Sequence, residues 1–276
     1  MKIAFFGTPP FTTQFLNTLA DGGYTPSLII TNPDRPVGRG MVLTSPEPKL
    51  WGDNHHITVL QPEKLDAAFV ETLKKDQWDL FVVVAYGKIV PQALLDIPRL
   101  GSINVHYSLL PKYRGATPVE SAILAGDTMT GISIQQMQFK LDSGPVYVKS
   151  EIAIASDDTT PTLRQKMNDE AVRLLIPTIK GIERGSLLPI EQDHTAATFT
   201  TKIKKEDGKL DLTEDHTIND RKYRAYAGSI GTYFIAQQDT KDIRMKIKTA
   251  HLANGQFLID EVIPENGKPI RFPQGL

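Results

Sequence analysis

The sequence predicts an α/β fold with a mostly parallel sheet and helices on both faces, followed by a small β-rich domain. Three observations predict it. Short β-favouring runs alternate with helical patterns through the first two thirds of the 276 residues, as in a parallel sheet covered by helices. The run 80–85 is uniformly apolar, so both of its faces must be covered. After about residue 200 the runs are short, β-favouring and punctuated by Asn, Gly and Asp.

The first part of the chain supplies the strands and helices of the predicted sheet. Four runs share an apolar, β-favouring composition: 2–6, 27–31, 80–85 and 102–106. Apolar residues at helical spacing predict helices over 11–19, after Pro9-Pro10, and over 65–73. This alternation is typical of a Rossmann-like arrangement, in which active sites lie beyond the carboxyl ends of the strands.

Two more strands and a long helix follow. Apolar residues that alternate with polar ones predict strands around 132–134 and 146–148. Asp158-Thr-Thr-Pro161 has the composition of a helix start. The expected buried stripe of this helix is Leu163, Met167, Ala171, Leu174, Thr178 and Ile182. Pro177 lies inside it and is expected to kink the helix or break its last turn.

Three contiguous segments are expected along the chain. Residues 1–190 form the catalytic domain, 191–203 a linker, and 204–276 the small C-terminal domain. The last segment is predicted to contain a helix over 216–225 and strands over 231–237, 245–250 and 256–262.

Composition limits the function. The 40% hydrophobic and 23% charged residues are typical of a soluble globular protein, and the apolar run 80–86 is too short to span a membrane, so a cytoplasmic protein is expected. Cysteine is absent, which excludes thiolate nucleophiles and Cys-ligated metals within this sequence. A net charge of −1 means that any contact with nucleic acid needs a local basic patch.

Two polar side chains of catalytic type lie two residues apart on the otherwise apolar strand 102–106. Residues i and i+2 of a strand point to one face, so Asn104 and His106 are presented side by side. Both fall at the carboxyl end of the strand, where the sites of such sheets lie. The turn-rich, cationic segment 108–115 follows and offers a place for a ligand. The pattern predicts a site rather than a core.

A carboxylate that could complete this pair is Asp142, in Leu141-Asp-Ser-Gly144. A carboxylate held against an imidazole orients the ring and stabilises its protonated form, as an acid–base pair requires. The alternative is an Asp-Ser-Gly turn in which Asp142 caps its own backbone. Spacing alone leaves both interpretations open.

Taken together, these segments resemble the signature of the 10-formyltetrahydrofolate-dependent formyltransferases and hydrolases. The resemblance rests on Asn104-Val-His106, on Ser-Leu-Leu-Pro-Lys-Tyr-Arg-Gly over 108–115 and on Leu-Asp-Ser-Gly over 141–144. It is close over about residues 1–190 and weaker beyond them. It implies that Asn104, His106 and Asp142 are the catalytic residues, that 10-formyltetrahydrofolate is the co-substrate, and that no metal takes part.

The resemblance also implies a folate site and a reaction. The expected cofactor-binding residues are Tyr86, Gly87, Ser108, Leu109, Leu110 and Pro111. The first two belong to 83–87, which resembles the strand end that walls the pterin pocket, and the other four form the loop that lies along the folate. The formyl group passes from N10 to an amine, with Asn104 and His106 donating to the oxyanion. Whether His106 or Asp142 is the immediate base stays open.

The segment 31–40 bears on the acceptor. With its two prolines and two glycines it is similar to the insertion loop of the methionyl-tRNA formyltransferases, which contacts the acceptor end of initiator tRNA. Arg35 and Arg39 can fork onto phosphates or stack on unpaired bases, and Lys112 and Arg114 join them as expected tRNA-binding residues. The resemblance therefore implies an enzyme that formylates the free amino group of initiator methionyl-tRNA. A monomer is expected.

Two rival functions stay open. After Ala250 the chain reaches its closing strand sooner than the OB-like C-terminal barrel of that family, so a truncated OB-like domain is expected. This shortening favours a sugar-nucleotide amine N-formyltransferase, which has a small acceptor. The second rival is a catalytically inactive RNA-binding relative, which the intact Asn, His and Asp make less attractive.

Overall fold

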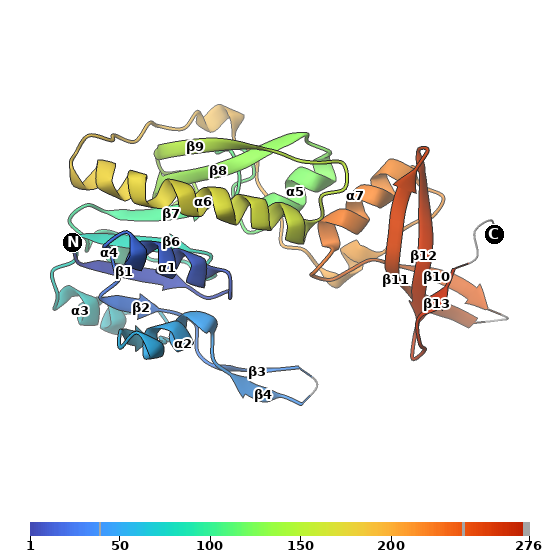
Figure 1. Ribbon diagram of the computed structural model, residues 1–276, viewed down its shortest axis with the longest axis horizontal. Helices are drawn as coiled ribbons and strands as arrows, with labels where there is room; N and C mark the ends of the chain where they lie inside the picture. The colour runs from blue at the N-terminus through green and yellow to red at the C-terminus, as the bar shows by residue number, and fades with distance from the viewer. Residues whose placement is uncertain (39, 239–240, 273–276) are drawn as a thin grey trace. The chain divides into compact units, whose positions relative to one another are not determined.

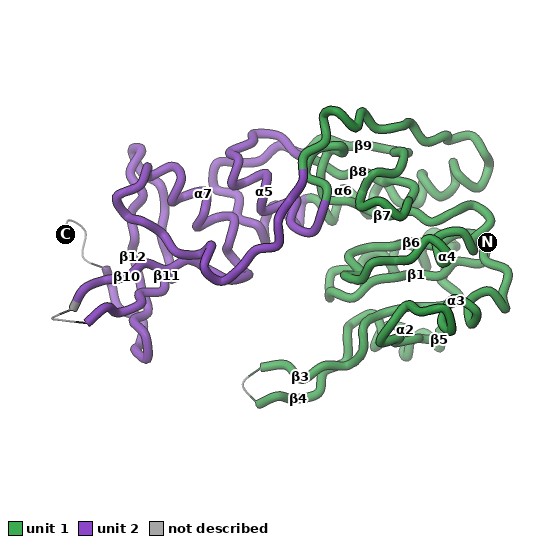
Figure 2. Tube along the Cα trace, turned by 180° about the vertical axis from the view of Figure 1, so that it is seen from behind, with its two compact units in different colours: residues 1–114, 131–151, 167–198 green, residues 115–130, 152–166, 199–276 purple. Residues whose placement is uncertain are grey.

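The computed structural model describes residues 1–38, 40–238 and 241–272. Its helices and strands follow one another as drawn in Figure 1. Packing divides the chain into two compact units, 1–114 with 131–151 and 167–198, and 115–130 with 152–166 and 199–276 (Figure 2). Neither unit is one of the contiguous segments expected from the sequence.

Helix packing explains why the second unit contains segments from before residue 190. Helix α5 (Pro118–Ala125) packs against α7 (His216–Tyr226). At the start of α6 (Thr160–Glu183), the Thr160 hydroxyl donates to the carbonyl of Ala225 at 2.6 Å. The Arg224 guanidinium also donates to the carbonyl of Asp158 at 3.0 Å. These segments therefore fold with the C-terminal part of the chain.

A seven-stranded sheet has the order β5-β2-β1-β6-β7-β8-β9. In chain order its strands are β1 Ile3–Gly7, β2 Leu28–Ile30, β5 Thr58–Leu60, β6 Leu80–Val84, β7 Ser102–His106, β8 Met129–Gln136 and β9 Val146–Ala153. The pairs from β5 to β7 are parallel, and β8 runs antiparallel to β7. This confirms the predicted mostly parallel sheet.

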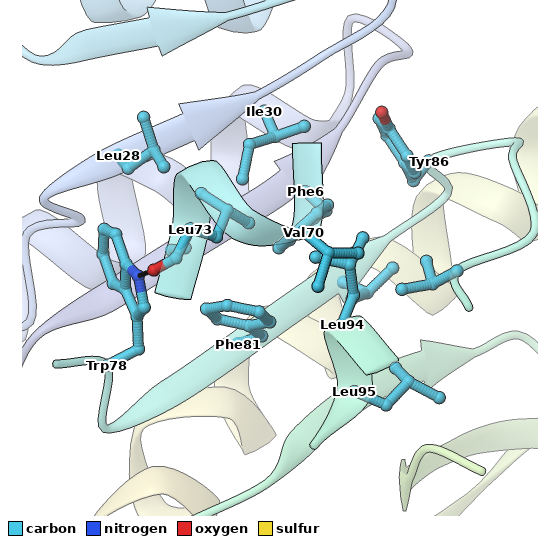
Figure 3. Packing of buried hydrophobic residues seen from close by; sticks show 13 residues of the cluster. Phe6, Leu28, Ile30, Val70, Leu73, Trp78, Phe81, Tyr86, Leu94 and Leu95 are labelled. Atoms are coloured by element: carbon cyan, nitrogen blue, oxygen red, sulfur yellow. Dashed lines mark hydrogen bonds between the residues drawn. The ribbon is translucent and has the colours of Figure 1, made fainter. Parts of the chain in front are cut away.

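One face of this sheet is covered by α3 (Ala67–Lys74) and α4 (Gln92–Leu95). Alternate residues of three strands, such as Phe6, Ile30 and Phe81, contribute to a buried cluster with these helices (Figure 3). The indole of Trp78 donates to the carbonyl of Leu73 at 2.8 Å, which satisfies a polar group at the edge of the cluster. The strict alternation follows from the two-residue period of a strand.

The opposite face carries α1 (Thr12–Asp21), α2 (Glu47–Asn54) and α6, so helices lie on both faces. The Trp51 indole of α2 donates to the Asn17 side chain of α1 at 2.6 Å, and the Tyr107 hydroxyl donates to Asn168 of α6 at 2.6 Å. Helix α6 continues past Pro177 to Glu183, so the expected break of its last turn is wrong, whereas the alternative, a kink, stays a prediction. The hydroxyl of Thr178 donates to the carbonyl of Leu174 in that turn.

The second unit contains a four-stranded antiparallel sheet, as the predicted β-rich domain requires. Its strands are β10 Tyr233–Gln238, β11 Lys241–Ala253, β12 Gln256–Pro264 and β13 Ile270–Arg271. The buried core of this sheet consists of Leu210, Phe234, Ile247, Phe257, Ile259 and Val262.

Three short elements remain. In the first unit, β3 (Arg35–Val37) and β4 (Val42–Thr44) form a hairpin, and His194–Ala196 form a 3₁₀ turn. In the second unit, Lys205–Gly208 form another 3₁₀ turn.

Candidate active site

The carboxyl end of β7 and the facing part of β8 form a polar surface. In the register of the two strands, Asn104 lies opposite Gln135, and His106 lies opposite Ser133. Asn104 is also the parallel partner of Val83 on β6. Paired residues of neighbouring strands point to the same face, so all four polar side chains extend the face that α3 and α4 cover elsewhere. The residues of β7 that alternate with Asn104 and His106 are apolar and point to the opposite face of the sheet.

His106 is held between two oxygen acceptors. Its side chain is only 6% exposed. Its Nε2 lies 2.9 Å from the Tyr113 carbonyl, and a carbonyl can only accept, so Nε2 carries a proton. Its Nδ1 lies 3.7 Å from Oδ2 of Asp142, beyond direct hydrogen-bond distance. The ring is therefore oriented by its backbone partner, with the other nitrogen aimed at the carboxylate.

Asp142 reaches this position from the loop between β8 and β9, where its backbone is left-handed (φ 47°). Gln135 donates from Nε2 to Oδ1 of the carboxylate at 2.8 Å, and Gln192 donates to the Asp142 carbonyl at 3.0 Å. A Cβ at Gly144 would lie 1.8 Å from the Gln136 carbonyl, which explains the glycine of the Leu-Asp-Ser-Gly segment. The structure thus places Asp142 beside His106.

Arg114 lies behind the site rather than on its surface. It is 1% exposed, and its Nη2 donates to Oε1 of Gln192 at 2.7 Å. Burial lowers the pKa of Arg114, while the charge of nearby Asp142 opposes this shift. A buried guanidinium with these partners is unavailable to RNA, so the predicted surface role of Arg114 does not fit the structure.

The loop 108–111 is tied to β8 and β9 through its backbone. The Ser133 hydroxyl donates to the Ser108 carbonyl at 2.7 Å and accepts from the Leu110 amide at 3.0 Å. The Lys149 ammonium donates to the Leu110 carbonyl. The side chains of Ser108 and Leu110 are buried, whereas Leu109 and Pro111 are partly exposed. Only the latter two present side-chain surface to a ligand.

The end of β6 turns sharply beside the site. Residues Ala85 (φ 46°) and Gly87 (φ 81°) are left-handed, and the Tyr86 carbonyl accepts from Nδ2 of the Asn32 side chain at 3.2 Å. The Tyr86 ring packs edge-on to Phe6 with centroids 5.5 Å apart. Burial raises the pKa of Tyr86 to about 12. Its side chain therefore belongs to the core, whereas Ala85 and Gly87 on either side of it are exposed.

Large apolar side chains near the site are exposed. Ile89, Phe139 and Leu141 are all well exposed, and they belong to the loops that follow β6 and precede Asp142. The backbone amide of Phe139 donates to the Gln92 side chain at 3.1 Å, which ties the loop before Asp142 to the start of α4. Exposed apolar surface beside convergent polar groups is typical of a binding site for an organic ligand.

The hairpin β3–β4 is fastened at its base by Asp34. The carboxylate accepts from Lys49 at 2.7 Å, from Gln61 at 2.7 Å and from Ser45 at 2.9 Å. These hydrogen bonds lower the pKa of Asp34 to about 2, with Lys49 the largest cause. Since Asp34 precedes β3 and Ser45 follows β4, the carboxylate joins both ends of the hairpin.

The cations predicted to meet RNA differ in position. Arg35 is 67% exposed, and its Nη2 lies 3.9 Å from Glu63, a weak and solvated ion pair. Lys112 is exposed beside the site loop. Arg39 lies outside the described residues. Exposed apolar side chains surround Arg35 on the hairpin: Val37, Met41, Val42 and Leu43.

Sequence reasoning did not identify two residues that contact Asp142. The sequence does contain a pattern that points to Gln135. Ser133 and Gln135 alternate with the apolar Ile132 and Ile134, just as Asn104 and His106 alternate with apolar residues on β7. Gln192 carried no such signal, since it lies in the segment expected to be a linker.

Neither a metal cluster nor a membrane-spanning helix is found in the part of the chain that the structure describes. Within 1–38, 40–238 and 241–272, no group of three His, Asp or Glu is arranged to hold a metal ion. Of the helices in those ranges, none combines the length and apolar character that crossing a bilayer requires.

A known family and several known proteins match this sequence. Residues 1–179 match the family model described as formyl transferase. The methionyl-tRNA formyltransferase of Halalkalibacterium halodurans is 45% identical over 216 residues, which cover 78% of this chain and 68% of the relative. That of Nitrosospira multiformis is 41% identical over 227 residues, covering 82% of this chain and 73% of the relative.

A solved structure shares the fold. The N-formyltransferase from Helicobacter canadensis, in complex with folinic acid and dTDP-3-aminofucose, superimposes with a TM-score of 0.68. The match covers 94% of this chain and 95% of that one, at 17% sequence identity. At this identity the likeness concerns the fold alone.

Proposed function

The chain belongs to the formyl transferase family, and we propose that it transfers the formyl group of 10-formyltetrahydrofolate to the amino group of initiator methionyl-tRNA. The product is N-formylmethionyl-tRNA. Relatives at 41–45% identity carry the name methionyl-tRNA formyltransferase, which supports tRNA as the acceptor.

One observation carries the chemistry: the meeting of Asn104, His106 and Asp142 on one polar surface. Acyl transfer to an amine needs a donor for an oxyanion and an acceptor for a proton. The half-buried amide of Asn104 supplies the donor. His106, with Asp142 3.7 Å from its ring, supplies the acid–base pair. A small closure when substrate binds would bring the two groups into direct hydrogen-bond distance.

The reaction balances with these groups alone. The neutral amine attacks the formyl carbon, and its electron pair forms the new C–N bond. The formyl oxygen becomes an oxyanion that accepts hydrogen bonds from Asn104 and, once its Nε2–H turns from the Tyr113 carbonyl to the substrate, from His106. The pair of His106 and Asp142 takes the proton that the amine loses. When the intermediate collapses, the bond to N10 breaks and a proton goes to N10, leaving tetrahydrofolate.

The folate is proposed to lie along the exposed apolar side chains near the site. Ile89, Phe139 and Leu141 offer surface for its flat rings, and Leu109 and Pro111 offer more. The turn at 85–87 would then face the pterin through its backbone, in keeping with the buried Tyr86 ring. Folinic acid, a formylated folate, is bound in the Helicobacter canadensis protein of the same fold.

The tRNA acceptor end is proposed to meet the hairpin β3–β4. The base of the hairpin is held by Asp34 and its Arg35 is exposed, so the hairpin can stack on unpaired bases or contact their phosphates. Lys112 adds an exposed cation in the loop beside the catalytic residues. Arg39 joins them on sequence grounds alone. A tRNA substrate favours the cytoplasm, and a monomer is expected, which light scattering after gel filtration tests.

The proposal is tested by supplying 10-formyltetrahydrofolate with charged initiator tRNA or with amino-sugar nucleotides. Mass spectrometry of the aminoacyl group released from the tRNA should show a gain of one formyl group, and Asn104→Ala should abolish most of it. Formylation of an amino sugar with no reaction on tRNA would overturn the acceptor. Failure with both would favour the binding-only relative.

The sugar-nucleotide alternative rests on one observation. The antiparallel sheet of the second unit has four described strands and a small core, less surface than a complete barrel offers to RNA. The assay above compares the two acceptors directly, and the kcat/KM for each decides between them.

A further inference from the structure

Gln135 stands out among the residues around the site, because it is a polar side chain buried without full use of its polar atoms. It is 2% exposed and lies on β8 directly opposite Asn104. Its Nε2 donates to Oδ1 of Asp142 at 2.8 Å. Its Oε1 is buried and has no hydrogen-bond partner among the described residues. Of the two polar atoms of this side chain, only the nitrogen therefore has a described partner, and that partner is the Asp142 carboxylate.

The orientation of the amide follows from its partner. Nitrogen and oxygen of a glutamine side chain are assigned from the hydrogen bonds they make. The reverse orientation would set the carbonyl oxygen of Gln135 against an oxygen of the Asp142 carboxylate, and neither oxygen can donate a hydrogen bond. The N–H group must therefore face Asp142, which leaves Oε1 unpaired.

Stability does not explain this arrangement. A buried acceptor without a partner keeps its desolvation cost, which an apolar side chain of the same length would avoid. Methionine has that length and would fill the same space beside Asn104. What distinguishes the amide from methionine here is the N–H group that it directs at Asp142.

We propose that Gln135 is a positioning residue that holds the Asp142 carboxylate with Oδ2 toward Nδ1 of His106. Gln192 fixes only the backbone of Asp142, through its carbonyl. Gln135 fixes the carboxylate itself, from a rigid strand in the sheet. With Oδ1 bonded at 2.8 Å, rotation about the last side-chain bond is restrained, and Oδ2 remains 3.7 Å from the imidazole. This inference rests on the proposed formyl transfer.

The first test compares Gln135→Met with the matched control Gln136→Met. Gln136 is the next residue of β8 and points to the other face, so the control makes the same change on the same strand away from Asp142. We expect Gln135→Met to lower kcat about tenfold, with KM for 10-formyltetrahydrofolate within about twofold of the unchanged protein. The melting temperature of both variants should stay within a few degrees.

Two results would overturn the proposal. One is a Gln135→Met variant with the kcat of the unchanged protein. The other is a loss of kcat that accompanies an equal loss in the control or a large fall in melting temperature, because that pattern marks a purely structural role.

A second variant gives a readout that packing alone would not move. Gln135→Glu keeps the shape but sets a second carboxyl group against Asp142, with His106 and Arg114 as the other charged or titratable groups nearby. When the new carboxyl group is protonated, it can donate a hydrogen bond to Asp142 as the amide does. When it is ionised, its charge repels the Asp142 carboxylate. We expect kcat relative to the unchanged protein to fall as pH rises from about 5.5 to 8. A ratio independent of pH would contradict the proposal.

Failure of this inference can be told from failure of the proposed function. If the unchanged protein formylates an amino-sugar nucleotide instead of tRNA, the acceptor is wrong, yet the same comparison of kcat on that acceptor still tests Gln135. If tRNA is formylated and Gln135→Met leaves kcat intact, only the positioning role fails.

Discussion

The polar surface of β7 and β8 and the hairpin β3–β4 are built on opposite principles. On β7 and β8, the side chains of His106 and Gln135 are almost fully buried, and each has a partner at a defined distance. On the hairpin, Arg35 is exposed, its ion pair is long, and large apolar side chains face solvent. The first arrangement fixes atoms to the accuracy that catalysis needs, and the second leaves side chains free to adapt to a large, flexible acceptor.

The two regions also differ in where their order comes from. The β7–β8 surface is held by strand register, because Asn104 opposite Gln135 follows from the pairing of the whole strands. The hairpin is held at its base, where Asp34 bonds to three side chains. Substitutions at the first region should therefore change turnover, whereas substitutions at the second should change acceptor binding.

The largest effect is expected at Asn104. Asn104→Ala should lower kcat by about 100- to 1,000-fold, because it removes an oxyanion donor. Folate affinity, measured by calorimetry, should hardly change, and stability should be retained since the side chain is only half-buried. A rate equal to that of the unchanged protein would remove Asn104 from the catalytic residues.

The next effect separates a buried cation from an exposed one. Arg114→Met should lower the free energy of unfolding by on the order of 3 kcal/mol, because Gln192 and Asp142 lose a buried charged partner. Urea unfolding measures it, with exposed Arg184→Ala as the control that should change little. A selective rise of KM for tRNA with unchanged stability would restore the surface role that the sequence suggested for Arg114.

The features that the sequence could predict are those that leave a local pattern along the chain. Strand and helix periodicity located the parallel sheet, since buried strands and amphipathic helices leave a strong local pattern. The pair Asn104 and His106 stood out because polar residues at i and i+2 on an apolar strand are unusual. The register that sets Gln135 against Asn104 is a long-range pairing, so single-strand patterns could not identify it.

The misplaced residues have physical reasons as well. Arg114 follows a lysine and a tyrosine in a turn-rich loop, which suggests exposure, but its partner Gln192 arrives from 78 residues later in the chain. The domain boundary at residue 190 was expected from local punctuation. Residues of α5 and α6 belong to the second unit because they contact α7. These contacts join segments far apart in the sequence, so local punctuation does not indicate them.

A smaller effect is expected on the hairpin. Arg35→Ala and Arg39→Ala should each raise KM for tRNA about tenfold while KM for 10-formyltetrahydrofolate stays the same, because a lost phosphate or stacking contact weakens only the acceptor. Arg184→Ala is again the control. Equal changes in both KM values would indicate a folding defect and break the contrast between the two regions.

The smallest effect concerns the fastening of the hairpin by Asp34. Because the pKa of this carboxyl is lowered to about 2, its stabilisation is present above the ordinary carboxyl pKa of about 4 and is lost as pH falls toward 2. The difference in unfolding free energy between the unchanged protein and Asp34→Asn should therefore be constant above about pH 5 and shrink below pH 4.

At neutral pH the same variant should raise KM for tRNA only about two- to threefold, since the hairpin loosens but keeps its cations. Exposed Asp21→Asn is the matched control. If Asp34→Asn lowered kcat instead of tRNA affinity, the base of the hairpin would be coupled to the catalytic surface. The division between a rigid site and an adaptable one would then be wrong.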